Sequence, residues 1–164
     1  MKIAGLVLIA LLGTVLTADC QENPVSWSTV SMKKSVRPGQ EFTVMVSAGI
    51  NPGWHIYSIS QASGGPTPTS ITVPGKQPFA LTGFVIGPVP HSAYDQNFQL
   101  ETETYQQAAS FKIPLIAAKT LKTGPNSVAI DVRFQACNDR ICLPARTVRL
   151  NARLKVDAER TTQK

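Results

Sequence analysis

Residues Glu41–Ile50 read EFTVMVSAGI, and apolar side chains occupy every second position of this stretch. Two later stretches repeat the pattern, namely residues 128–136, VAIDVRFQA, and residues 148–156, VRLNARLKV. Successive side chains of a β-strand point to opposite faces, so a period of two indicates strands with one buried and one solvated face. The sequence therefore predicts a fold built from half-buried strands.

Weaker strands are predicted between turn signals such as Asn51-Pro52-Gly53 and Pro74-Gly75. They cover residues 25–30, 54–59, 70–73, 81–86, 100–105 and 110–116. No apolar stripe with the 3.6-residue period of a helix follows residue 20. About nine short strands separated by turns are typical of an all-β, immunoglobulin-like antiparallel β-sandwich. This is the fold class that we predict.

The first twenty residues have the features of a secretory signal peptide. Lys2 precedes an almost wholly apolar run at residues 3–16, and small or polar residues follow it. We expect a signal peptide at residues 1–20, one domain at 21–157 and a tail at 158–164. A lipid anchor on Cys20 is the less favoured alternative, because Asp19 stands where a lipoprotein signal has a small residue.

The chain carries a formal net charge of +6, and its excess of bases lies after Asp131. Such an excess attracts nucleic acid or acidic lipid in some proteins. Here the bases alternate along predicted strands and no aromatic residues are interleaved with them, as a single-strand binder would need. We therefore interpret them as a solvated sheet face and expect no nucleic-acid partner.

Two cysteines, Cys137 and Cys142, remain once Cys20 is assigned to the signal segment, and a pair in an oxidising compartment forms a disulfide by default. The four residues between them begin with Asn138-Asp139, which suits a hairpin loop. The two cysteines would then face each other across a ladder rung, where Cα atoms lie about 4.5 to 5.5 Å apart. Pro144 has no amide hydrogen for the ladder, so we expect this rung at an accessible edge.

Three functions remain open for this pair. A permanent clip in a β-sandwich that binds a protein or glycan is one, although closing so short a loop contributes only about 2 kcal/mol. A metal carrier that uses Cys137, Cys142 and His55 is another, but the spacing does not fit a four-ligand zinc knuckle. Reversible thiol–disulfide exchange is the third. It needs only the disulfide itself, and we expect no cofactor and no metal ion.

Three motifs in this order resemble the amino-terminal periplasmic domain of the DsbD thiol:disulfide interchange protein family. They are FQACNDRICLP at residues 134–144, GWHIYS with GGPTPTS at residues 53–70, and YDQNF at residues 94–98. The resemblance implies an immunoglobulin-like fold with a redox-active cysteine hairpin and a periplasmic location. It also implies a membrane-embedded electron donor, and acceptors that are oxidised periplasmic disulfide isomerases or thioredoxin-like proteins of cytochrome c biogenesis.

The resemblance also suggests roles for individual residues. Cys137 and Cys142 match the redox pair, with Cys142 making the bond to the partner. Phe98 with Asp95 matches a loop that caps the pair, and His55 and Tyr57 match ring side chains beside the disulfide. Packing within the sandwich is the alternative for both rings. Full-length members continue into a transmembrane part that this sequence does not include, so we expect either that the donor is a separate polypeptide or that the relay runs differently here.

Overall fold

The structure is a computed structural model that describes residues 23–158. The predicted signal peptide at residues 1–20, Cys20 and all but one residue of the predicted tail lie outside this range. No helix within the described range is long and apolar enough to cross a membrane.

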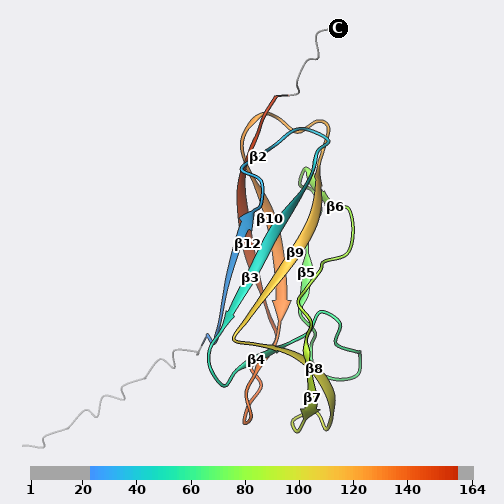
Figure 1. Cartoon of the computed structure of the whole chain (residues 1–164), viewed down its shortest axis with the longest axis vertical. Helices are drawn as coiled ribbons and strands as arrows, with labels where there is room; N and C mark the ends of the chain where they lie inside the picture. The colour runs from blue at the N-terminus through green and yellow to red at the C-terminus, as the bar shows by residue number, and fades with distance from the viewer. Residues whose placement is uncertain (1–22, 159–164) are drawn as a thin grey trace, which may run out of the picture.

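Twelve strands arranged in three four-stranded sheets build the described part of the chain (Figure 1). The first sheet has the order β1 (Val25–Ser31), β3 (Glu41–Ile50), β9 (Ala108–Ala117), β6 (Phe79–Leu81). The second has the order β2 (Ser35–Val36), β12 (Arg146–Val156), β10 (Gly124–Phe134), β5 (Ser70–Thr72). The third has the order β11 (Ala136–Cys137), β4 (His55–Tyr57), β8 (Leu100–Gln106), β7 (His91–Asp95).

The hydrophobic core contains the inward side chains of the two long sheets. Phe42, Val44 and Val46 of β3 are at most 4 % exposed, and the residues between them on the strand are more exposed. Strands β9, β10 and β12 contribute the same alternation to one core cluster. Every pairing is antiparallel except the two-residue contact of β2 with β12. The predicted immunoglobulin-like antiparallel sandwich is confirmed.

One strand prediction was wrong at the edge of the first sheet, and one strand of the third sheet was missed. The strand predicted at residues 81–86 ends at Leu81, and only Ile86 pairs further on, with Lys112. The chain then passes close to the core at Gly87, where an added Cβ would lie 3.0 Å from the Tyr105 hydroxyl. Strand β7 was not predicted, since its first four residues are all exposed and show no alternation.

The chain also leaves the second sheet earlier than predicted. Strand β10 ends at Phe134, and Ala136–Cys137 forms β11, which pairs with β4 in the third sheet. Cys142 does not begin the next long strand, because β12 starts only at Arg146. The cysteine hairpin is thus the tip of the β10–β12 hairpin, turned from the second sheet onto the third.

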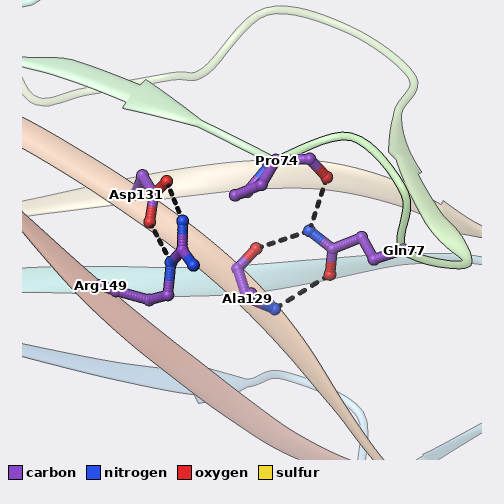
Figure 2. Close-up of polar contacts among 5 residues, drawn as sticks. All are labelled: Pro74, Gln77, Ala129, Asp131 and Arg149. Carbon is purple, nitrogen blue, oxygen red and sulfur yellow. Dashed lines mark hydrogen bonds and ion pairs between the residues drawn. The ribbon is translucent and has the colours of Figure 1, made fainter.

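The side chain of Gln77 extends the pairing of β10 beyond the end of β5 (Figure 2). Its Nε2 donates to the carbonyl oxygens of Ala129 and Pro74 at 2.9 and 3.1 Å, and its Oε1 accepts from the Ala129 amide at 3.0 Å. Nearby, Arg149 of β12 makes a two-pronged ion pair with Asp131 of β10, with both contacts at 2.7 Å. The Gln77 amide therefore takes the place of a backbone rung.

Replacement of Gln77 by leucine should lower the free energy of unfolding by about 1 to 3 kcal/mol, because the Ala129 amide and carbonyl lose their partner at the sheet edge. Urea denaturation of the oxidised protein measures this loss. Gln106→Leu, at an exposed position on β8, is the matched control and should change stability by less than about 0.5 kcal/mol. Equal effects of the two substitutions would contradict the role of Gln77.

Candidate active site

The outer face of the third sheet carries the predicted site residues. Cys137 pairs with His55 across β11 and β4, and Tyr57 lies two residues further along β4. Since paired and alternate residues point to the same face, all three project outward. Ile56 and Ala136 project to the opposite face and belong to the main core. Tyr57 and Cys137 are both fully buried, at 0 % exposure, outside that core cluster.

The cysteines form a disulfide across a tight hairpin, as the local sequence predicted. Their Cα atoms lie 4.1 Å apart, slightly closer than the expected range, and they are paired as a single antiparallel bridge. The side-chain oxygen of Asn138 accepts hydrogen bonds from the amides of Arg140 and Ile141 at 2.9 and 2.8 Å. This side chain therefore stabilises the turn independently of the disulfide.

The two cysteines differ in their exposure to solvent. Cys137 is 0 % exposed and lies between β4 and Cys142 in the backbone pairing, whereas Cys142 is half-buried. Pro144, two residues further on, is exposed and outside any strand, as expected. A partner that approaches from solvent can therefore reach Cys142 more readily than Cys137.

A hydrogen-bonded chain joins His55, Tyr57 and Asp95. The Tyr57 hydroxyl donates to Asp95 Oδ2 at 2.7 Å and lies 3.3 Å from His55 Nε2. Burial, and then the hydrogen bond and charge of Asp95, raise the pKa of Tyr57 well above its usual range, so the phenol keeps its proton. Asp95 was predicted in a loop, but it is the last residue of β7 and only 8 % exposed.

Phe98 lies in the turn between β7 and β8 and contacts Tyr57. The two rings are 5.8 Å apart, edge to face, and Phe98 is half-buried. Within this turn the Asn97 amide donates to Asp95 Oδ1 at 2.8 Å, and Asn97 Nδ2 lies 3.4 Å from the Asn138 carbonyl oxygen. The structure thus brings Phe98 and Asp95 beside the hairpin, and their role as a cap stays a prediction. Sequence reasoning missed Asn97, since asparagine is ordinary in turns.

Stability should depend on the protonation of His55. Burial lowers the pKa of His55 below 6.5, against the charges of Asp95 and Asp139. The unfolded state therefore binds a proton before the folded state does, and stability is lost as the pH falls from 6.5 through the folded pKa. Urea denaturation between pH 8 and pH 5 should show a smaller loss for His55→Gln than for the wild type. His91→Gln is the matched control, and an equally reduced loss there would contradict the assignment.

Within residues 23–158, no group of three or more His, Cys, Asp or Glu side chains is arranged to hold a metal ion. Cys137, Cys142 and His55, the ligands of the metal-carrier alternative, therefore do not form such a group in the disulfide form.

One family model matches most of the chain in sequence. The family model for the N-terminal part of thiol:disulfide interchange protein DsbD matches residues 22–153. No curated protein matches the chain in sequence. The N-terminal periplasmic domain of ScsB from Proteus mirabilis is similar in fold, with a TM-score of 0.55 and 13 % identity over 80 % of this chain and 47 % of that one. This chain thus spans about half the length of that structure.

The reduced DsbD N-terminal domain from Neisseria meningitidis is also similar in fold, with a TM-score of 0.50 and 15 % identity over 79 % of this chain and 85 % of that one. The identities are low, so the two structures support the fold, and the family match rests on the sequence model. That match covers the sandwich and the cysteine hairpin together. The chain therefore belongs to the family of DsbD N-terminal domains, which are thiol–disulfide interchange modules.

Proposed function

We propose that this protein is a periplasmic protein-disulfide reductase that relays electrons through Cys137 and Cys142. Its donor is a membrane-embedded DsbD-like protein, and its acceptors are oxidised thioredoxin-like or disulfide isomerase proteins. The observation that carries the proposal is a disulfide with one buried and one half-exposed cysteine, on a hairpin that other contacts already hold. The family to which the chain belongs supports the same chemistry.

The reaction exchanges two electrons in two steps. The Cys142 thiolate attacks a sulfur of the acceptor's disulfide, a mixed disulfide forms, and the acceptor's other sulfur leaves as a thiolate. The Cys137 thiolate then attacks the Cys142 sulfur and releases the acceptor's second thiolate. The protein ends with the disulfide seen here, and the acceptor ends as a dithiol that carries the two protons. The donor reverses both steps.

The surrounding residues have supporting roles in this proposal. Phe98 is the cap over the pair, and Asp95 fixes the start of the cap turn through its hydrogen bond with the Asn97 amide. Tyr57 provides the surface on which the Phe98 ring rests, and its hydroxyl ties Asp95 to β4. His55 lies opposite Cys137 in the backbone register. In this proposal its ring limits access to the Cys137 sulfur from the side of β4.

A permanent clip is the weaker alternative. The hairpin is closed by the paired backbone at residues 136–143 and by the Asn138 side chain, so the disulfide adds little that these contacts lack. Closing a loop of this length contributes only about 2 kcal/mol. A bridge that joins distant segments would be a better staple.

A redox titration tests the proposal. The folded protein is equilibrated in glutathione buffers of graded potential, the thiols are trapped by acid and alkylation, and the oxidised fraction is measured by mass spectrometry. We expect a reversible two-electron transition while circular dichroism shows an intact sandwich. A disulfide that resists dithiothreitol until the domain unfolds would contradict the proposal and favour the clip.

A further inference from the structure

A cavity of about 460 Å³ opens on the outer face of the third sheet, beside the cysteine hairpin. Thr102 and Thr104 of β8 form part of its floor, and they are 3 % and 7 % exposed. Asn138 and Asp139 of the hairpin line one side, and Asp95, at the end of β7, lines another. The cavity is separate from the Phe98 ring, which does not line it.

The cavity lies next to the redox bond. His55 lines it and is the backbone partner of Cys137, and Asp139 is the second residue after Cys137. A protein whose disulfide meets Cys142 therefore places the residues that flank this disulfide near the cavity mouth. The space exceeds the volume of one side chain, so a flanking side chain can enter together with part of its backbone.

The charge of the cavity is opposite to that of the chain. Asp95 and Asp139 contribute carboxylates from two separate segments, and within residues 23–158 no lysine or arginine lines the cavity, although the chain carries a net charge of +6. Both carboxylates act to raise the pKa of His55, while burial lowers it more strongly. Both carboxylates therefore act on the His55 ring, and its burial favours the neutral form of the ring.

The lining discriminates between possible occupants. An anionic side chain would meet two carboxylates, and an apolar one would separate the threonine and asparagine groups from water without replacing their hydrogen bonds. A cationic side chain has neither cost. Asp95 can accept it, because a carboxylate offers about four acceptor positions and the contacts with Tyr57 and Asn97 use two of them.

We propose that this cavity binds a lysine or arginine side chain of the partner protein, close to the partner's reacting disulfide, and so selects partners by charge. The proposal rests on the proposed function, because it concerns the partner in that exchange. Asp139 is exposed and attracts the cation first, and Asp95 lies deeper. Because the attraction by Asp139 acts in solvent, we expect it to change the rate of exchange, and we expect salt to weaken this effect.

The test uses three synthetic peptides, each with one intramolecular disulfide between two cysteines. They differ only in the residues on both sides of the disulfide, which are Lys, Gln or Glu. The second-order rate of their reduction by the reduced protein is measured at low and high salt. We expect the Lys peptide to react about fivefold faster than the Gln peptide at low salt, and the Glu peptide to be slowest. The differences between the three rates should become smaller at high salt.

Asp139→Asn should remove most of the preference for Lys over Gln, and Glu41→Gln, which changes the net charge equally on β3, should keep it. The ratio of the two rates corrects for any change in thiol reactivity. Equal rates for all three peptides, or a preference that Asp139→Asn and Glu41→Gln alter alike, would overturn the charge selection and leave the exchange function standing. Reduction of none of the peptides would instead contradict the proposed function.

Discussion

Replacing Cys137 by alanine should cause stable mixed disulfides to accumulate through Cys142, whereas replacing Cys142 should yield few. A resolving cysteine releases the partner from the mixed disulfide, so its loss traps the complex, and loss of the attacking cysteine prevents the complex from forming. The exposures support this order, since Cys137 is 0 % exposed and Cys142 is half-buried. We expect nearly all trapped partner to depend on the Cys142 sulfur.

Non-reducing gels of both variants, expressed in an extracytoplasmic compartment, measure the trapped complexes, and reduction of the same samples should release the partners. Both variants should fold, because the Asn138 turn and the pairing of β11 with β4 do not need the disulfide. Trapping only by Cys142→Ala would reverse the two roles. Trapping by neither variant, with both unstable, would support the structural clip.

Replacing Phe98 by alanine should accelerate alkylation of the reduced cysteines in the folded protein by about fivefold. The edge-to-face contact of Phe98 with Tyr57 is 5.8 Å between centroids. Such a pair contributes on the order of 1 kcal/mol, so its loss makes opening of the turn correspondingly easier. Global stability should fall by only about the same amount, since the residue lies in a half-buried turn and not in the core.

The alkylation rate is followed with a small maleimide under native conditions, and stability is followed by urea denaturation. Phe84→Ala is the matched control, because Phe84 is 93 % exposed in the segment between β6 and β7 and should change neither quantity. If Phe98→Ala unfolds the domain while the alkylation rate of the folded fraction is unchanged, Phe98 is a packing residue and not a cap.

The long strands were predictable because their environment is simple. Each of β3, β10 and β12 lies between a core and water over many residues, so the alternation survives in the sequence. Strand β7 shows the opposite case. Its first four residues are exposed at a sheet edge, and their pairing with β8 is made by backbone groups that leave no trace in the side-chain pattern.

The site was predictable in part, and the limits have a physical cause. The cysteine hairpin depends on contacts within eight residues, so Asn138 and the spacing of the cysteines were sufficient to predict it. The hydrogen bond of Tyr57 to Asp95 joins residues 38 positions apart and depends on the register of β4, β8 and β7. The cavity beside His55 depends on the same long-range register, and local sequence does not specify it.

The path of the chain at residues 135–145 also bears on how the domain reaches its native redox state. The hairpin contacts are local, so they can form within microseconds in an otherwise unfolded chain. Strand β4, which buries Cys137, must arrive from about 80 residues earlier in the sequence, and such long-range pairing forms more slowly. A newly made chain therefore passes through an interval in which both sulfurs are equally open to any oxidant. The difference in exposure between the two cysteines arises only when β4 docks.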